Sequence, residues 1–177
     1  MENLRESPIS PYSLGKVAST HFLQMLHRTE NFPVVILRLF LTYGPGQDSK
    51  RFIPQIIRGC IRDEAFPTTA GEQLRDFCYV EDTARAILQA LIISKIEGEV
   101  FNISSGECIL IRTVIENICT LTNAGKPQYG KIFYRPKENM ALYADISKAN
   151  KLLQWKPIIS LVEGLKKTIN YYENDYA

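Results

Sequence analysis

The sequence lacks long apolar runs. No segment approaches the roughly 18 consecutive apolar residues of a membrane-spanning helix, and the opening Met-Glu-Asn-Leu-Arg-Glu lacks the apolar stretch of a secretory signal. The chain also has no lysine- or arginine-rich run, and its formal net charge is only +2. We therefore expect neither a membrane nor a nucleic acid among its partners.

Cysteine is scarce and shows no pattern. The four cysteines, Cys60, Cys78, Cys108 and Cys119, have no C-x-x-C spacing and lie within apolar stretches. This arrangement favours buried, reduced thiols over a metal site or a disulfide framework. Because reduced thiols are typical of reducing compartments, the sequence predicts a cytoplasmic protein.

Glycine-rich phosphate loops are absent as well. Neither G-x-x-G-x-x-G nor G-x-G-x-x-G follows any expected strand, and such a loop is what holds the pyrophosphate of a dinucleotide.

The 177 residues, 45% hydrophobic and 23% charged, are within the range of one globular domain with a substantial core.

Strands and helices alternate along the chain, which indicates an α/β fold. The apolar run at 33–40 is typical of a strand covered on both faces in a parallel sheet. Residues 42–47 are expected to form a loop. Helices are expected at about 11–28, 52–62 and 111–121, after Glu81-Asp82, and after Ser147 and Ser160; strands are expected at 33–40, 76–80, 98–103 and 131–134.

Helical spacing also predicts which side chains face inward. The first helix would bury Leu14, Ala18, Phe22 and Met25. The second would bury Phe52, Ile53, Ile56, Ile57 and Cys60. The helix after Glu81-Asp82 would bury Val80, Ala84, Ile87, Leu88 and Leu91.

Tyr12 and Lys16 lie four residues apart, so on a helix they share one face, one turn apart. A phenol is a poor base at neutral pH, but a nearby ammonium favours the phenolate form. The pair is suited to moving a proton on or off a hydroxyl. An ordinary helix surface is the alternative, because Tyr-x-x-x-Lys often arises by chance.

The residues that flank Tyr12 and Lys16 favour the proton-transfer pair over the ordinary helix surface. The segment 10–16, Ser-Pro-Tyr-Ser-Leu-Gly-Lys, resembles the active-site helix of the extended short-chain dehydrogenases. These are NAD(P)-dependent epimerases, dehydratases and reductases that act on nucleotide sugars. The resemblance implies that Tyr12 is the acid/base on the sugar hydroxyl. It also implies that Lys16 binds the nicotinamide ribose, so both residues would contact the cofactor.

A second segment, 38–47, resembles the family sequence Arg-x-Phe-Asn-x-Tyr-Gly-Pro-Gly-Gln, which passes the nicotinamide and the substrate. It implies that Tyr43 and Gly44 lie at the cofactor. Leu41 takes the position of an Asn that contacts the sugar nucleotide, so one polar contact is missing. From local chemistry alone, a strand leaving into a tight loop fits equally well.

A third segment, 71–82, resembles Gly-x-x-x-Arg-Asp-Phe-x-x-Val-x-Asp. It implies that Arg75 clamps the nucleotide diphosphate, since a planar guanidinium matches phosphate oxygens bidentately. Asp76 is expected to be structural. We expect Arg75 in a cleft on the Tyr12 side of the molecule, with its guanidinium free of a tight partner.

A fourth resemblance joins 134–138, 144–149 and 152–157 to the family's C-terminal signature. It implies that Arg135 contacts the ribose and phosphate of the nucleotide. The Gly-Asp that usually follows Arg-Pro is Lys137-Glu138 here. The resemblance therefore extends from Ser10 to about Tyr172.

The resemblance implies that residues 1–177 are the C-terminal half of a Rossmann-like fold. They would comprise the last strands of the parallel sheet and a small α/β substrate-binding domain, without the glycine-rich N-terminal half. The implied partner is a nucleotide-diphosphate sugar, and the implied cofactor is NAD or NADP. Dimers of family members, which form through the Tyr-bearing helix and its neighbour, imply a homodimer by analogy.

The implied activity is that of a nucleotide-sugar epimerase, dehydratase or 4-keto reductase. In such an enzyme Tyr12 would take the proton from the C4 hydroxyl of the sugar, or return it, while hydride passes to or from the nicotinamide. Lys16 would hold the nicotinamide ribose and favour the phenolate form of Tyr12. Surface polysaccharides, including lipopolysaccharide, would receive the product. The alternative is a truncated, non-catalytic remnant, or a sugar-nucleotide-binding module that cannot hold the dinucleotide alone.

Overall fold

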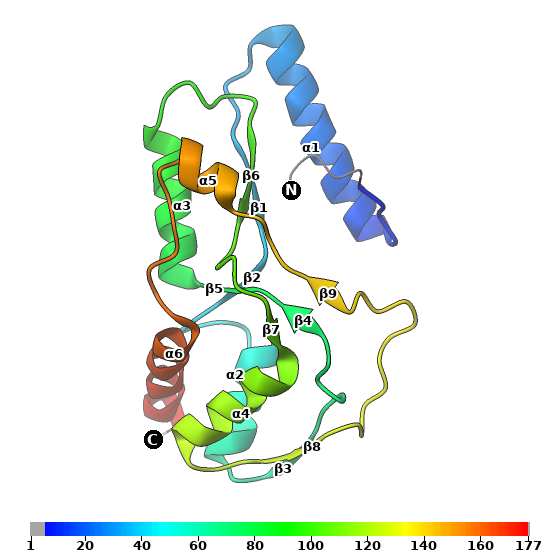
Figure 1. The fold of residues 1–177 in the computed structure, drawn as a ribbon, viewed down its shortest axis with the longest axis vertical. Helices are drawn as coiled ribbons and strands as arrows, with labels where there is room; N and C mark the ends of the chain where they lie inside the picture. The colour runs from blue at the N-terminus through cyan, green and yellow to red at the C-terminus, as the bar shows by residue number, and fades with distance from the viewer. Residues whose placement is uncertain (1–5, 177) are drawn as a thin grey trace.

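The structure, a computed structural model, describes residues 6–176. It is elongated, with two regions joined by short strands (Figure 1). The sheet region holds α1 (Pro11–Glu30), β1 (Ile36–Leu39), α3 (Val80–Ile92), β6 (Val100–Ile103) and α5 (Ser147–Leu152). The helical region holds α2 (Phe52–Ile61), β3 (Ala65–Pro67), α4 (Ile111–Thr122), β8 (Lys126–Gln128) and α6 (Leu161–Tyr176).

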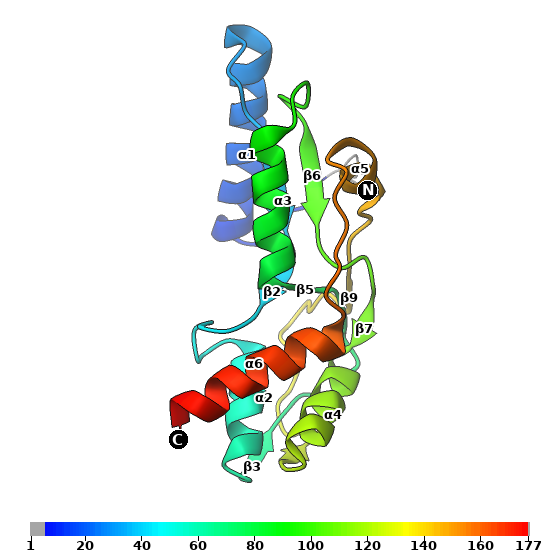
Figure 2. The same cartoon turned by 90° about the vertical axis from the view of Figure 1, so that its left-hand side faces the viewer.

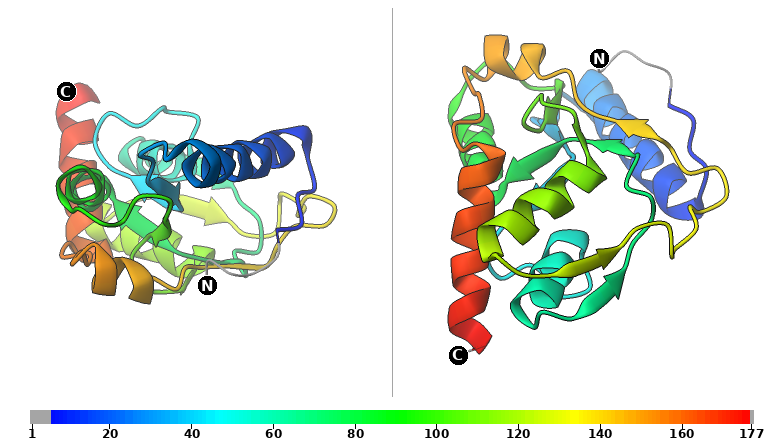
Figure 3. Two further views of the ribbon diagram at one scale, coloured as in Figure 1. Left: turned by 90° about the horizontal axis from the view of Figure 1, so that it is seen from above. Right: turned by 60° about the horizontal axis from the view of Figure 1, so that its bottom comes forward.

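The sheet region is built on one parallel strand pair. β1 pairs with β6 in the register Ile36↔Val100 to Leu39↔Ile103, and α3 and α1 lie on opposite sides of the pair (Figures 1 and 3). The predicted parallel α/β arrangement is confirmed. The predicted burial of the first strand on both faces is wrong: β6 is fully buried, but β1 is half-buried and Leu39 is exposed.

Short strands join the two regions. β2 (Leu41–Tyr43) pairs in parallel with β5 (Phe77–Tyr79). β4 (Leu74–Arg75) lies between β7 (Ile109–Leu110) and β9 (Ala141–Leu142). The expected loop at 42–47 therefore begins inside a strand, since β2 continues to residue 43.

The strand predicted at 131–134 does not form. The chain leaves β8 through a turn in which Gly130 has a left-handed φ of 76°. Beyond the turn, Ile132 donates its backbone N–H to the carbonyl of Thr68 at 3.0 Å, but no ladder is assigned to 131–134. One backbone bond fixes the segment in place without making it a strand.

The helical region contains the larger core. α2 buries Ile53, Ile56, Ile57 and Cys60, as its periodicity predicts, with Phe52 packed at the edge. α4 contributes Val114, Ile115 and Ile118, and α6 crosses both helices (Figure 2). Three helices thus bury one another's apolar faces, which is where most helical stability in proteins originates.

The helices of the sheet region behave differently. α1 begins where predicted, with Ser10 Oγ accepting the N–H of Ser13, but no residue of α1 is buried. Its predicted inward residues are exposed, with Phe22 at 57%. In α3 the predicted inward face is also wrong: Ile87, Leu88 and Leu91 are exposed, whereas Asp82, Thr83 and Ala86 are buried.

Two fully buried carboxylates fix the loops around the joining strands. Asp76 accepts the backbone N–H groups of Ser105 (2.9 Å), Gly106 (3.1 Å) and Ala144 (3.1 Å), and the Ser105 hydroxyl (2.6 Å). Asp82 accepts the N–H groups of Ile158 and Ile159 and pairs with Arg85. The predicted structural role of Asp76 is confirmed.

The cysteine prediction is partly confirmed. Cys60 and Cys78 are buried and Cys119 is half-buried, whereas Cys108 is exposed because it follows the turn after β6. All four are free thiols. Within residues 6–176, no group of three or more potential metal ligands gathers, and no helix is long and apolar enough to cross a membrane.

Candidate functional site

Two adjoining cavities open beside β2. The first, which we call the arginine cleft, has a volume of about 430 Å³ and is lined by residues that include Leu41, Arg75, Arg135 and Glu138. The second, the β2 cavity, has a volume of about 590 Å³ and lies along residues 39–43. Leu41 and Phe52 line both, so the two cavities share a wall.

The arginine cleft gathers all three residues to which the sequence assigned a substrate role. Leu41 comes from β2, Arg75 from β4 and Arg135 from the segment between β8 and β9. The rest of the wall is largely apolar, with Ile56 from α2 and Ile115 from α4. The cleft therefore combines two guanidinium groups with apolar surface, a combination common in ligand sites.

Arg75 lies in this cleft, but its guanidinium is not free. Its side chain is only 12% exposed. One terminal nitrogen donates to the carbonyl of Leu74 at 2.9 Å, and the other donates to Glu138 Oε1 at 2.5 Å. The expectation of an unpartnered guanidinium is wrong, because a carboxylate 63 positions further along the chain folds back onto it.

Arg135 and Glu138 are the ends of one tight turn. The N–H of Glu138 donates to the carbonyl of Arg135 at 3.0 Å, Pro136 is the second residue, and Lys137 has a left-handed φ of 61°. Pro in the second position and positive φ in the third are typical of a type II turn, which favours glycine there. Lys137 adopts this conformation at a cost of about 1–2 kcal/mol. Arg135 itself is exposed, and among the described residues its side chain has no ionic partner.

Tyr43 and Gly44 lie at the end of β2, beside the β2 cavity. Tyr43 is 2% exposed, and its hydroxyl donates to the carbonyl of Leu161 at 3.2 Å. Burial raises the pKa of Tyr43 above its ordinary value. A Cβ on Gly44 would meet Val80 Cγ1 at 2.5 Å, so the close approach here is to α3. Any contact of these two residues with a cofactor stays a prediction.

Tyr12 and Lys16 share one face of α1, as their spacing predicts. The ammonium of Lys16 lies 5.6 Å from the centroid of the Tyr12 ring, and Tyr12 is 76% exposed. Neither residue lines the arginine cleft or the β2 cavity. The first turn of α1, which carries Tyr12, lies on the same side of the molecule as β9 (Figures 1 and 3).

Arg51 lines the β2 cavity and was missed by the sequence reasoning. It is the N-cap residue of α2 and makes no side-chain capping bond. A cation at a helix N-terminus opposes the helix dipole. That unfavourable placement, four positions after the last residue of the Gly-Pro-Gly-Gln segment, was the available signal, because local rules are broken most often at functional positions.

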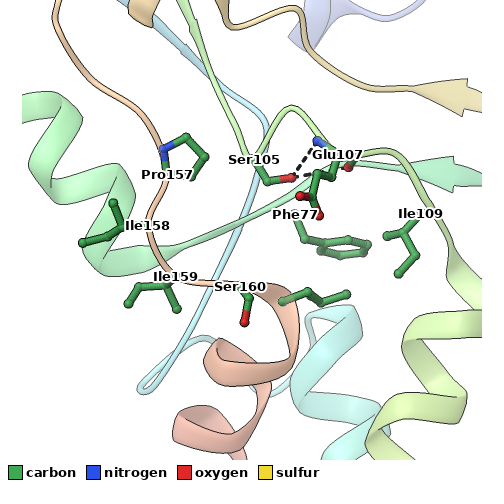
Figure 4. Close-up of a pocket in the computed structure, with 9 residues that line it drawn as sticks. Phe77, Ser105, Glu107, Ile109, Pro157, Ile158, Ile159 and Ser160 are labelled. Atoms are coloured by element: carbon green, nitrogen blue, oxygen red, sulfur yellow. Dashed lines mark hydrogen bonds between the residues drawn. The ribbon is translucent and has the colours of Figure 1, made fainter.

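A smaller cavity of about 260 Å³ lies behind the joining strands, between the turn after β6 and residues 157–161 (Figure 4). Phe77, Ile109 and Ile159 form its apolar wall. Its Ser105 hydroxyl is already occupied, since it donates to Asp76 and accepts the N–H of Glu107. None of the residues given a role above lines this cavity.

A dinucleotide needs both a nicotinamide end and a cradle for its pyrophosphate. The Tyr12–Lys16 pair suits the ribose beside a nicotinamide. β1, however, leads into β2, and the turn after β6 leads into β7, so within residues 6–176 neither parallel strand of the sheet region is followed by a helix on a glycine-rich loop. Such a helix N-terminus is what binds the pyrophosphate. The residues present fit only part of the cofactor.

Comparison with known proteins identifies relatives along the whole chain. Residues 1–168 match the family model described as GDP-mannose 4,6 dehydratase. A dTDP-glucose 4,6-dehydratase from Haemophilus influenzae is 33% identical over an aligned length of 178 residues, gaps included, and the match covers 93% of this chain and 52% of that enzyme.

Solved structures of nucleotide-sugar epimerases are similar over nearly the whole chain as well. A UDP-glucuronic acid 4-epimerase from Bacillus cereus, in complex with UDP-glucuronic acid and NAD, is 34% identical with a TM-score of 0.90, over 99% of this chain and 56% of that one. A UDP-glucose 4-epimerase from Thermotoga maritima with UDP-glucose is 28% identical with a TM-score of 0.90, over 100% and 60%. The chain spans about half the length of the curated relatives it matches, and it belongs to the NAD-dependent epimerase/dehydratase family, whose members act on nucleotide sugars.

Proposed function

We propose that the arginine cleft binds the diphosphate of a nucleotide sugar. The observation that carries this proposal is the gathering of Arg75, Arg135 and Leu41 on one cleft from three distant segments. A guanidinium fork suits phosphate oxygens, and the apolar wall suits a flat base. The B. cereus epimerase, similar over 99% of this chain, is solved with UDP-glucuronic acid, which supports the same ligand class here.

We further propose that the chain is the C-terminal, substrate-binding half of an epimerase, dehydratase or 4-keto reductase. Tyr12 would hold or release the proton of the sugar hydroxyl, with Lys16 beside it to favour the phenolate. The exposed hydroxyl of Tyr12 is open to a substrate. A nicotinamide, when bound, supplies hydride exchange. The binding site for the pyrophosphate of that dinucleotide would have to come from further polypeptide.

A binding module without catalysis is the second candidate. One observation favours it: α1, which carries the acid/base pair, has no buried residue, so the chain itself does little to fix Tyr12 in space. Catalytic groups need positions held to within about 0.5 Å. This chain alone would then bind a nucleotide sugar and leave it unchanged.

Calorimetric titration of the 177-residue chain with UDP and dTDP tests the cleft. Arg75→Lys keeps the charge but loses the fork, so we expect affinity to fall about tenfold, equivalent to roughly 1.4 kcal/mol. Arg28→Lys, at the exposed end of α1, is the matched control and should change nothing. Equal affinities for wild type and Arg75→Lys would remove the diphosphate assignment.

A chimera separates the two candidates. The N-terminal half of the H. influenzae dehydratase would be joined to this chain, and turnover of dTDP-glucose measured. Tyr12→Phe should then lower turnover by about 10²–10⁴-fold, the usual worth of a positioned acid/base. A folded, NAD-loaded chimera without turnover would favour the binding module. Micromolar NAD(H) affinity of the 177-residue chain alone would contradict the need for a second half.

A further inference from the structure

Arg75, the residue proposed above to bind a diphosphate, is already paired with an anion of its own chain. Glu138 Oε1 lies 2.5 Å from a terminal nitrogen of Arg75, and the two side chains are 23% and 12% exposed. The other terminal nitrogen donates to the carbonyl of Leu74. An incoming diphosphate therefore meets a guanidinium whose cleft-facing charge is neutralised.

The carboxylate is held there by a turn that makes few other contacts. We call residues 135–138 the Glu138 turn. The chain is fixed before it, where Tyr134 Oη accepts the N–H of Glu72 at 3.1 Å, and after it, where the carbonyl of Met140 accepts the N–H of Leu74 at 2.8 Å. Within the described residues, the Arg75–Glu138 pair is the only hydrogen bond or ion pair from the turn to the rest of the molecule.

The turn is also strained. Lys137 lies in the left-handed region with a φ of 61°, where a side chain is disfavoured. Because only one ion pair joins this strained turn to the rest of the molecule, the turn would have two positions to choose between. In one, Glu138 lies on Arg75. In the other, the pair is broken and Lys137 is free to relax.

We propose that Glu138 is an internal competitor for Arg75, and that a diphosphate displaces it and opens the Glu138 turn. This proposal rests on the proposed function of the cleft. The competition for Arg75 would make Glu138 a specificity-determining residue. A monoanion that replaced Glu138 would exchange one single negative charge for another and gain little. A diphosphate brings more than one charge and several acceptor oxygens, so only a ligand of this kind gains by the exchange.

Titration of the 177-residue chain with inorganic pyrophosphate tests the competition. Glu138→Gln keeps the shape of the side chain and removes its charge, so pyrophosphate should bind about tenfold more tightly. Glu72→Gln is the matched control, since Glu72 bonds to the neighbouring Tyr134 and does not touch Arg75. In an Arg75→Ala background, Glu138→Gln should have no effect. Acetate should compete with pyrophosphate only in Glu138→Gln.

Opening of the turn has its own readout. The N–H of Glu138 is bonded to the carbonyl of Arg135, so its hydrogen exchange in wild type should accelerate at least tenfold when pyrophosphate binds. Lys137→Gly should relieve strain in the closed turn and weaken pyrophosphate binding about threefold. Because this variant also removes the Lys137 ammonium, it is compared with Lys137→Ala, which removes the same charge but keeps a Cβ in the left-handed position; the difference between the two variants separates turn opening from charge removal.

The possible failures are distinguishable. Weaker pyrophosphate binding by Glu138→Gln would mean that Glu138 positions Arg75 for the ligand and would overturn the competitor role. Unchanged exchange at Glu138 would overturn the displacement, even if affinity rose. Unchanged affinity in Arg75→Ala, or no binding by any variant, would overturn the proposed function of the cleft, and the competitor role with it.

Discussion

α1 and α2 show how differently the two regions of the molecule are stabilised. α1 has 20 residues and buries none of them, whereas α2 has 10 residues and buries five. Both carry apolar side chains at helical spacing. In the helical region those side chains meet α4 and α6, and in the sheet region they face outward. Amphipathic spacing therefore specifies a helix without specifying what covers it.

The exposed apolar side chains of the sheet region gather on two helices. On α1 they include Leu14 and Phe22, and on α3 they include Leu88 and Leu91, the last at 77% exposure. Exposed apolar groups in such number are typical of a surface that another polypeptide covers. The chimera described above tests whether an N-terminal half of the kind found in a longer relative covers this surface.

The largest expected difference between the regions is in the cost of truncating an apolar side chain. Ile57 on α2 is fully buried, so Ile57→Ala should lower the free energy of unfolding by about 2–5 kcal/mol. Phe22→Ala on α1 removes a larger but exposed side chain and should cost less than about 0.5 kcal/mol. Urea denaturation of both variants, followed by circular dichroism, measures the two costs.

The same two variants, made in the chimera that carries the N-terminal half of the H. influenzae dehydratase, test whether that half covers α1. If that half covers α1, Phe22→Ala should there cost about 2 kcal/mol or more, while the cost of Ile57→Ala stays the same. Equal costs for Phe22→Ala in the chain and the chimera would mean that α1 remains exposed in both.

Sequence reasoning found the elements with strong local signals. The Ser10 cap and Pro11 marked the start of α1, and the apolar residues of α2 marked its buried face. It failed for the inner face of α3, because the apolar stripe there is exposed and the helix is held instead by the buried Asp82. It also failed at 131–134. The composition of that segment suggests a strand, but a strand forms only where the backbone pairs with a neighbouring strand, and these residues have no such partner.

In the site, sequence reasoning selected residues that the fold brings together but could not give their partners. Leu41, Arg75 and Arg135 line one cleft. The pairing of Arg75 with Glu138 joins positions 63 apart and depends on a turn with positive φ at a lysine. No local pattern encodes such a contact. Arg51 was missed because its signal, a cation at a helix start, is weak in isolation.

A smaller loss in the free energy of unfolding is expected at the hydrogen bonds that join the two regions. Asp82, at the start of α3, accepts the N–H groups of Ile158 and Ile159, which lead into α6. Asp82→Asn would replace one acceptor oxygen by a donor in a fully buried site, so we expect a loss of about 2–3 kcal/mol. The two regions should then unfold separately.

Fluorescence of Trp155, in the core of the sheet region, reports that region, whereas circular dichroism reports the helices of both regions. Comparing the two signals distinguishes the two outcomes. Their urea transitions should coincide in wild type and diverge in Asp82→Asn. Glu97→Gln, on an exposed residue beyond the end of α3, is the control and should leave both transitions unchanged. Coincident transitions in Asp82→Asn would show that other contacts join the regions.

The smallest expected effect is a difference in local opening, which the thiols report. Cys78 lies in the core of the sheet region, and Cys60 lies in that of the helical region. Burial raises the pKa of Cys78 to about 11 and that of Cys60 to about 12. At pH 8 both are protonated in the closed state, so alkylation requires local opening, and raising the pH increases the reactive fraction of each.

Iodoacetamide labelling, followed by mass spectrometry of tryptic peptides, resolves each cysteine. The exposed Cys108 should react first and sets the rate for an open thiol. Cys78 should follow, and Cys60 should be at least about tenfold slower than Cys78, a difference of roughly 1.4 kcal/mol in opening. That order follows from a sheet region whose helices bury little and a helical region whose three helices bury one another. Equal rates for Cys60 and Cys78 would mean that the molecule opens as one unit, and exposure of α1 would then have no consequence for the stability of the strands beside it.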